Sequence, residues 1–160
     1  MRHNIDALYN ADSRILILGS FPSRRSRDDG FFYAHPQNRF WPLIAGITGN
    51  AVPLTVAEKK AMCLNSGIAV WDVVASCDLV GSSDSSIKNV VVNDIARLVR
   101  DSGIQHIFLN GGTAGRLYER HITGNIDIRY DILPSTSPAN AAFDMERLFS
   151  HWRGIVEYLK

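Results

Sequence analysis

The segment RILILG, residues 14–19, is a short apolar run that stops at a glycine. Three further segments have the same character: residues 68–74 (IAVWDVV), 105–110 (QHIFLN) and 128–133 (IRYDIL). Apolar runs of this length, without strict alternation, are typical of strands that are covered on both faces. The sequence therefore predicts four buried strands.

Helical patterns separate these strands, at residues 39–44, 55–67, 93–103, 113–121 and 144–159. Thr55 and Glu58 have the spacing of a capping box, and Asn93 can cap the next helix. Strands that alternate with helices indicate βαβ units and a mainly parallel sheet. The predicted fold class is α/β, with residues 81–86 (GSSDSS) as a polar loop inside the domain.

Length and charge set limits on the organisation of the chain. At roughly 150 residues per domain, 160 residues predict a single domain, 1–160. Seventeen Lys and Arg side chains against sixteen Asp and Glu give a formal net charge of +1. Capture of nucleic acid by bulk charge is therefore not supported, although a local basic patch remains compatible with this composition.

Cysteine content and hydropathy bear on the compartment. Cys63 and Cys77 are too few for an iron–sulfur cluster or a four-cysteine zinc site, and they suit a reducing environment. No segment approaches the ~20 apolar residues of a membrane span, and residues 1–12 lack the apolar core of a secretory signal. We therefore expect a soluble cytoplasmic protein.

The predicted strands are followed by segments rich in Gly, Pro, Ser or Asn, at residues 19–23, after Val74, at 110–112 and at 134–138. Ligands of open α/β sheets bind at this edge, so we expect the site there. The glycine segments lack a dinucleotide fingerprint and a P-loop, the five histidines have no metal spacing, and no nucleophile elbow is present.

Residues 31–41, FFYAHPQNRFW, contain five aromatic side chains, a histidine, an asparagine and an arginine. In one interpretation the aromatics belong to the core and Asn38 caps a helix that starts at Arg39. In the other, the aromatics form a pocket that stacks a planar base. A basic cluster lies upstream, at Arg24, Arg25 and Arg27. It can bind phosphates or form a solvated loop neutralised by neighbouring aspartates.

Four blocks, in this order, resemble the uracil-DNA glycosylase superfamily: LILGSFPS (16–23), YAHPQNRFWPLI (33–44), GIAVWDVVASC (67–77) and LPSTSPAN (133–140). Within it they are most similar to the hypoxanthine-DNA glycosylase (DNA-deoxyinosine glycosylase) branch. The resemblance implies a three-layer α/β/α fold around a four-stranded, mainly parallel sheet. It also implies a monofunctional base-excision repair enzyme, without metal or cofactor, that acts on DNA. Because one damaged base needs only one subunit, we expect a monomer. Such an enzyme extrudes a deaminated base, preferentially hypoxanthine, and hydrolyses its N-glycosidic bond.

The resemblance also implies roles for individual residues. Uracil- and thymine-directed relatives carry a water-orienting Asn or Asp where Phe21 stands, and the residue that substitutes for it is Asn38. The other expected pocket residues are Gly19, Ser20, Phe21, Tyr33, Trp71, Asp72 and Asn110. The expected DNA contacts are Arg24, Arg25, Ser135, Thr136, Ser137, Pro138 and Asn140. Leu133 replaces the histidine of the best-known uracil enzymes, and Ser23 replaces a glycine common in the branch.

Asn38 carries a neutral amide, so it cannot act as a general base. We expect its carbonyl oxygen to accept a hydrogen bond from the attacking water and so to position it. Backbone N–H groups of residues 19–21, with Asn110 or Ser135, are expected to stabilise the negative charge on the departing purine. Three alternatives stay open: a uracil or thymine-mismatch glycosylase, a non-catalytic nucleic-acid-binding module with the same fold, and a free-nucleoside hydrolase.

Overall fold

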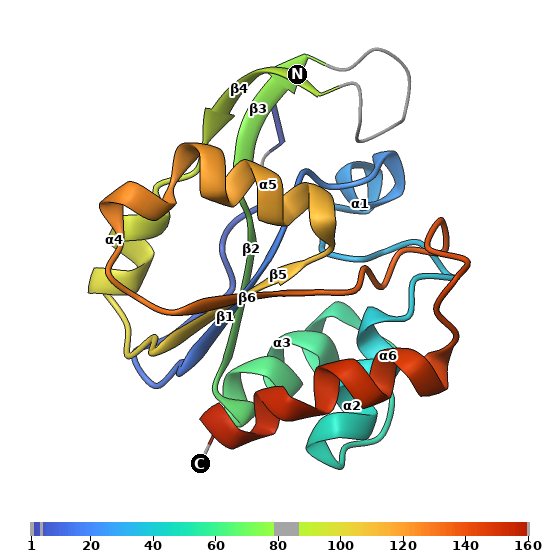
Figure 1. Ribbon diagram of the computed structural model, residues 1–160. Helices are drawn as coiled ribbons and strands as arrows, with labels where there is room; N and C mark the ends of the chain where they lie inside the picture. The colour runs from blue at the N-terminus through green and yellow to red at the C-terminus, as the bar shows by residue number, and fades with distance from the viewer. Residues whose placement is uncertain (1, 4, 79–86, 160) are drawn as a thin grey trace.

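The computed structural model describes residues 2–3, 5–78 and 87–159, so the predicted loop at 81–86 lies outside the described residues. A central sheet of four strands is formed by β1 (Ile15–Gly19), β2 (Ile68–Asp72), β5 (His106–Asn110) and β6 (Tyr130–Leu133). The strand order is β2-β1-β5-β6 and every pairing is parallel (Figure 1). The predicted parallel sheet is therefore confirmed.

Helices cover both faces of this sheet (Figure 1). One face packs against α2 (Phe40–Thr48), α3 (Val56–Ser66) and α6 (Met145–Trp152). The other packs against α4 (Ile95–Arg100) and α5 (Gly112–His121). The side chains of β1 are buried on both faces, with Ile15 and Ile17 in one core and Leu16 and Leu18 in the other. This two-sided burial explains why the strand sequences are continuous apolar runs.

The second predicted strand is too long. β2 ends at Asp72, and the chain continues into a hairpin of β3 (Val74–Asp78) and β4 (Lys88–Val92) that the sequence analysis did not predict. The apolar run continues past Asp72 because Val73 and Val74 are buried in the core beneath α4 and α5. Apolar content therefore marks burial here, and the strand pairing changes within it.

Two of the predicted helices differ from those in the structure. Asp94, and not Asn93, caps α4, because its side chain accepts a hydrogen bond from the Arg97 backbone N–H. Asn93 instead donates its side-chain N–H to the carbonyl oxygen of Asp72, at 2.8 Å. The predicted helix at 144–159 divides into α6 and a 3-10 helix, Arg153–Tyr158.

Two helices lie beside the edge where the strands end. α2 begins at Phe40, one residue later than predicted, and the Asn38 side-chain oxygen accepts a hydrogen bond from the Phe40 N–H. α1 (Arg24–Asp29) was not predicted as a helix; the Ser23 side chain caps it, and Gly30 ends it in a left-handed conformation. The part of the chain that the structure describes contains no helix long and apolar enough to cross a membrane.

Candidate active site

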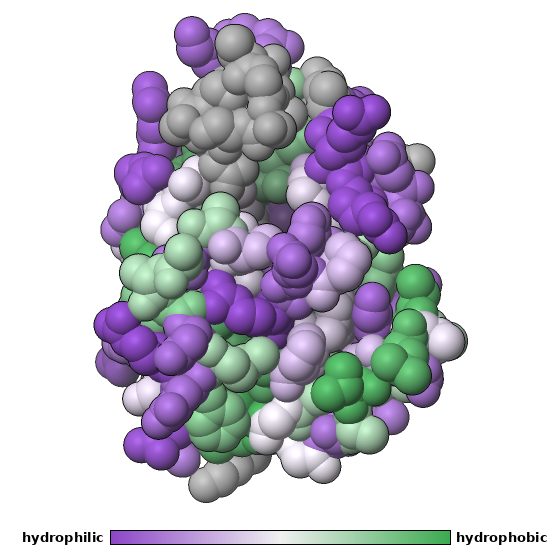
Figure 2. Space-filling model, turned by 90° about the vertical axis from the view of Figure 1, so that its right-hand side faces the viewer, coloured by the Kyte–Doolittle hydropathy of each residue, from purple (hydrophilic) through white to green (hydrophobic). Residues whose placement is uncertain are grey.

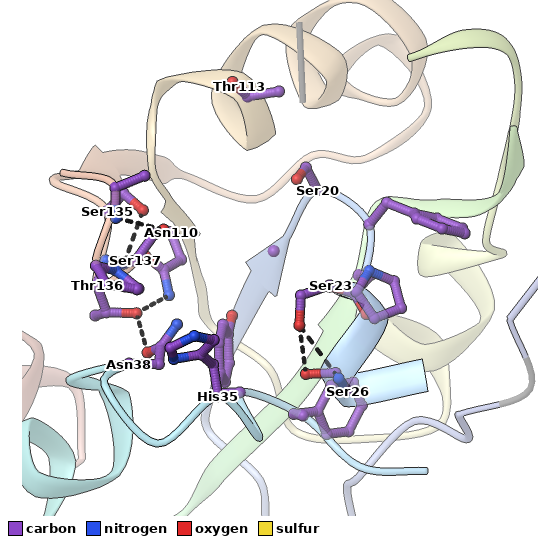
Figure 3. Close-up of a pocket in the computed structure, with 18 of the residues that line it drawn as sticks. Ser20, Ser23, Ser26, His35, Asn38, Asn110, Thr113, Ser135, Thr136 and Ser137 are labelled. Carbon is purple, nitrogen blue, oxygen red and sulfur yellow. Dashed lines mark hydrogen bonds between the residues drawn. The ribbon is translucent and has the colours of Figure 1, made fainter. Parts of the chain in front are cut away.

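A pocket of about 700 Å³ opens at the carboxyl edge of the sheet. Its lining comes from the end of β1 and α1, from the loop before α2, from the ends of β2 and β5, and from the loop after β6. In Figure 3 the lining side chains lie on two opposite sides of the pocket. Figure 2 shows the face of the molecule that carries these loops, on which many side chains are hydrophilic. The pocket thus lies where the strand-end rule predicted a ligand site.

One side of the pocket, the amide wall, consists of Asn38, Asn110 and Thr136. The Asn110 amide nitrogen donates to Thr136 Oγ1 at 3.0 Å, and Thr136 Oγ1 donates to Asn38 Oδ1 at 2.9 Å (Figure 3). Asn110 Oδ1 accepts from the Thr136 backbone N–H at 3.0 Å. Thr136 is fully buried, so these bonds are shielded from competing water.

The backbone determines which way both amides point. A backbone N–H is only a donor, so the atom of Asn110 that faces the Thr136 N–H must be its oxygen. In the same way the atom of Asn38 that faces the Phe40 N–H, at 2.9 Å, must be its oxygen. The carbonyl oxygen of Asn38 therefore already accepts two hydrogen bonds. The expected acceptor for the attacking water is thus occupied, and the amide nitrogen is the end turned away from Thr136 (Figure 3).

The residue after Asn38 fixes the loop that completes this wall. The Arg39 guanidinium donates only to carbonyl oxygens of that loop, those of Thr136, Ser137, Asn140 and Phe143. The Arg39 backbone N–H also donates to the Thr136 carbonyl oxygen, at 3.1 Å. The planar guanidinium can serve several acceptors at fixed angles, so one side chain holds much of the loop after β6.

Gly19, Tyr33 and Asp72 meet at the floor of the pocket. A Cβ atom on Gly19 would lie 2.6 Å from Asp72 Oδ1 and 3.1 Å from the Tyr33 hydroxyl oxygen, so the floor needs glycine there. The Tyr33 ring stacks on Phe40 with centroids 4.1 Å apart. Burial, and then the charge of Asp72, raise the pKa of Tyr33 far above its usual value. The phenol therefore keeps its proton at neutral pH.

The opposite side of the pocket, the α1 wall, is formed by residues 20–24, 26 and 27. Phe21 is buried and packs edge-on against His3, with ring centroids 5.3 Å apart. Arg24 lines the pocket, its side chain is 87% exposed, and its guanidinium is 3.9 Å from Asp28. This wall therefore presents an exposed cation beside the pocket mouth.

Most of the predicted site residues line the pocket, and three do not. Arg25 pairs with Asp29 on α1 at 3.1 Å. Asn140 donates to the Ser135 carbonyl oxygen at 3.0 Å, within its own loop. Trp71 packs against both cores, whereas the next residue of β2, Asp72, lines the pocket.

Both interpretations of residues 31–41 describe part of the structure. Four of the five aromatic side chains are core residues, namely Phe31, Phe32, Phe40 and Trp41. Tyr33 lines the pocket and also packs against the core.

Several lining residues were not among the expected pocket residues or DNA contacts, among them Ser26, Phe32, His35 and Thr113, and Arg27 was named only as part of the basic cluster. His35 lies inside the aromatic block and Arg27 inside the basic cluster, so a local signal existed for both. Within the described residues, no group of three or more His, Cys, Asp or Glu side chains is arranged to hold a metal ion.

Comparison with known proteins agrees with this geometry. The chain matches the uracil DNA glycosylase superfamily over residues 7–160, and it belongs to that superfamily. A hypoxanthine DNA glycosylase from Methanosarcina acetivorans is 32% identical over 160 residues, 99% of either chain. A hypoxanthine DNA glycosylase from Methanosarcina barkeri is 30% identical over 132 residues, 81% of this chain and 82% of that one.

A solved structure is similar throughout. The solution NMR structure of a candidate uracil DNA glycosylase from Methanosarcina acetivorans has a TM-score of 0.85 and 30% identity, covering 99% of this chain and 98% of the other. The superfamily and the three-layer fold expected from the four sequence blocks are both confirmed.

Proposed function

We propose that this chain is a monofunctional DNA glycosylase of base-excision repair that hydrolyses the N-glycosidic bond of deoxyinosine and releases hypoxanthine. The observation that carries the proposal is the position of Asn38 in the pocket wall at the carboxyl edge of the sheet. Two relatives named hypoxanthine DNA glycosylase support the choice of base.

The reaction defines what the pocket has to do. As the bond between the sugar carbon C1′ and the base nitrogen N9 breaks, positive charge develops on the sugar and negative charge on the purine. An enzyme must extrude the nucleotide, hold a water near C1′ and stabilise the leaving purine. Extrusion costs a few kcal/mol, and less for a mispaired base such as hypoxanthine.

We assign the reacting base to the space between the amide wall and the α1 wall. Backbone N–H groups of residues 19–21 at the end of β1 are proposed to stabilise charge on the purine. Tyr33 is proposed to stack on the base, because it lines the pocket and its ring already stacks on the Phe40 ring. Asn110 is proposed as a support for Asn38, since both ends of its amide bind Thr136.

The surroundings of the pocket are proposed to bind DNA. The loop of Ser135, Ser137 and Pro138 lines the pocket and suits insertion into the space that the extruded base leaves. Thr136, which was expected to contact DNA, is fully buried and supports this loop from inside. The exposed guanidinium of Arg24 suits a backbone phosphate, while Arg25 and Asn140 are proposed to act at the periphery. The proposal takes residues 1–160 as one catalytic domain that acts as a monomer.

The cytoplasm is the proposed compartment. Cys63 and Cys77 are both buried and are not joined in a disulfide bond, which suits a reducing environment.

A base panel tests the proposal. Oligonucleotides that carry one hypoxanthine, uracil, xanthine or mismatched thymine are incubated with the protein, in single-stranded and duplex form, and strand cleavage after alkali reports abasic sites. We expect cleavage at hypoxanthine to exceed cleavage at every other base. Preference for uracil or mismatched thymine would support the pyrimidine-directed alternative. Tight base-dependent binding without abasic sites would support the non-catalytic one, because Phe21 stands at the usual water-orienting position.

A further inference from the structure

We propose that Thr136 is a positioning residue that turns the amide of Asn38 so that its N–H₂ group, and not its carbonyl oxygen, faces the reacting nucleotide. Asn38 then acts as a hydrogen-bond donor to the departing purine. This inference rests on the proposed glycosylase function and assigns a chemical role within it.

The hydrogen bonds of the amide wall carry the argument. Asn38 Oδ1 accepts from the Phe40 backbone N–H and from Thr136 Oγ1, each at 2.9 Å. Two bonds use both lone pairs of a carbonyl oxygen. The Asn38 amide nitrogen forms no hydrogen bond with any residue that the structure describes, and Asn38 lines the pocket.

Rotation of the amide by a half turn is opposed from two sides. It would point N–H₂ at the Phe40 N–H and at the Thr136 hydroxyl hydrogen, leaving two donors without acceptors. The Thr136 hydroxyl cannot readily reverse its own direction, because it already accepts from the Asn110 amide nitrogen at 3.0 Å. Asn110 is in turn held by the Thr136 backbone N–H. The direction of donation is therefore fixed from Asn110 through Thr136 to Asn38, and the Asn38 amide nitrogen remains as a donor at the pocket.

A donor at this place matches the charge that develops on the base. The C1′–N9 bond breaks and its electron pair stays on the purine, while a water oxygen forms the new bond to C1′ and gives up one proton to solvent. The released purine takes up one proton, so the products are an abasic site and neutral hypoxanthine. An N–H directed at a purine ring nitrogen or carbonyl oxygen is strengthened as that charge grows, and so lowers the barrier.

Asn38→Asp and Asn38→Ala together separate a donor from an acceptor. One carboxylate oxygen of the Asp variant can keep both bonds of Asn38 Oδ1, so the change falls on the atom that faces the pocket. Single-turnover rates on inosine duplex are measured for both variants from pH 8 to about pH 4.5, with the ordinary Asp pKa at about 3.9. At each pH the rate of the Asp variant is divided by the rate of the Ala variant, because this ratio cancels acid effects on the substrate.

We expect the Asp variant to be no faster than the Ala variant at neutral pH, because a carboxylate repels the negative purine. The ratio should rise as the pH falls, since a protonated carboxyl regains a donor. An acceptor role predicts the opposite, with the Asp variant near the wild-type rate at neutral pH and slower in acid. A ratio that stays flat or falls on acidification overturns the inference.

The role of Thr136 is tested with Thr136→Val, which removes the hydroxyl at nearly constant volume, and Thr136→Ser, which keeps it. We expect the Val variant to lose about 10- to 100-fold in the single-turnover rate, as for a misplaced reacting group, with KM nearly unchanged. The Ser variant should recover most of the rate. Thr48→Val is the matched control, since the Thr48 hydroxyl donates to the Ile44 carbonyl oxygen within α2 and does not line the pocket.

A double variant completes the test. If Thr136 acts through Asn38, then Thr136→Val combined with Asn38→Ala should be no slower than Asn38→Ala alone. Additive losses, or a Ser variant as slow as Val, overturn the positioning role. A wild-type protein that releases no hypoxanthine overturns the proposed function itself, whereas an active wild type with the contrary variant results overturns only this inference.

Discussion

The two walls of the pocket differ in the sequence separation of the residues that their side-chain hydrogen bonds join. In the amide wall, Thr136 binds Asn110 and Asn38, which are 26 and 98 residues away in sequence. In the α1 wall, Ser26 binds Ser23, three residues away, and Ala34, eight residues away. The side-chain bonds of the amide wall join distant segments, whereas those around α1 are local. The start of the α1 wall is also held by the fold, because the Ser20 carbonyl oxygen accepts from the Val74 backbone N–H. The difference matches the proposed roles, because a reacting group needs placement within about 0.5 Å whereas a phosphate contact tolerates adjustment.

Gly19→Ala should have the largest effect, because Gly19 lies on the floor between the two walls. The added Cβ would lie 2.6 Å from Asp72 Oδ1, so the floor has to shift. We expect the excision rate to fall by at least about 100-fold. Overpacking should also lower the free energy of unfolding by about 1–3 kcal/mol.

Excision assays and thermal melts check this prediction. Gly46→Ala is the control, because its Cβ would meet the nearest Phe149 ring atom at 3.7 Å, an ordinary contact. It should keep full activity and stabilise α2 slightly. An active Gly19→Ala enzyme would show that the floor is not in contact with the reacting base.

Arg39→Met tests whether the amide wall needs its long-range bonds. The variant loses the guanidinium that holds the carbonyl oxygens of the loop after β6. We expect excision from duplex DNA to fall by about 10- to 100-fold, because the loop that we propose to fill the vacated stack is released. Single-stranded substrate has no paired stack to fill, so its excision should fall much less.

Arg147→Met is the matched control for this loop. Arg147 donates to the Ala142 carbonyl oxygen at 2.7 Å and lies over the Phe143 ring, so it touches the loop from the exposed side. Its loss should change the excision rate on duplex and on single-stranded DNA by less than threefold, because an exposed contact contributes little. Equal losses on single-stranded and duplex DNA in Arg39→Met would mean that Arg39 only stabilises the fold.

Arg24→Gln tests the proposed phosphate contact of the α1 wall. The variant should weaken DNA binding and lower the slope of log Kd against log salt concentration by about 0.9, the value for one phosphate contact. The excision rate at saturating enzyme should stay unchanged. Binding titrations at several salt concentrations measure this slope.

Arg97→Gln is the control for this charge change. Arg97 forms a similar exposed ion pair on α4, with Asp101 at 3.7 Å, and does not line the pocket. Its salt slope should equal that of the wild type. If the two variants behave alike, the α1 wall has no special contact with phosphate.

Ser23→Ala should have the smallest effect. It removes the cap of α1, a bond to the Ser26 backbone N–H. We expect a loss of about 1 kcal/mol at most in the free energy of unfolding and a change of less than threefold in the excision rate. Thr55→Ala, which removes the cap of α3 far from the pocket, should cost a similar amount in a thermal melt. A large rate loss in Ser23→Ala alone would mean that the α1 wall is also part of the catalytic machinery.

Local patterns were enough to predict the sheet and the place of the pocket. Three of the four apolar runs correspond to strands that are buried along nearly their whole length, β1, β2 and β5. The fourth, β6, is an edge strand whose residues are exposed or half-buried, so the prediction of four buried strands is wrong there. The capping box of Thr55 and Glu58 is present as predicted, since it depends only on residues three apart. The strand ends then located the pocket through a rule of parallel sheets.

Other features depend on partners that no local pattern reveals. β4 pairs with β3 and is exposed or half-buried throughout, and its apolar residues are only the three valines at 90–92, too short a run to indicate a buried strand. α1 has six residues, of which only Ser26 is buried, so it has no apolar stripe. The orientation of the Asn38 amide depends on Thr136, 98 residues away, so no local pattern shows that its oxygen already accepts a hydrogen bond. Most of the residues that line the pocket could be named from sequence, but the direction of their hydrogen bonds required the fold.

The most direct measurement is the single-turnover release of hypoxanthine from inosine duplex by the wild-type protein and by Asn38→Ala. We expect rapid release by the wild type and a rate lower by about 10²–10³-fold in the variant, the usual cost of one preorganised donor. DNA binding should be unchanged, and a melt should show only a modest loss of stability, from the two bonds that Asn38 Oδ1 accepts from the Phe40 N–H and the Thr136 hydroxyl. A variant that releases hypoxanthine as fast as the wild type would contradict the account.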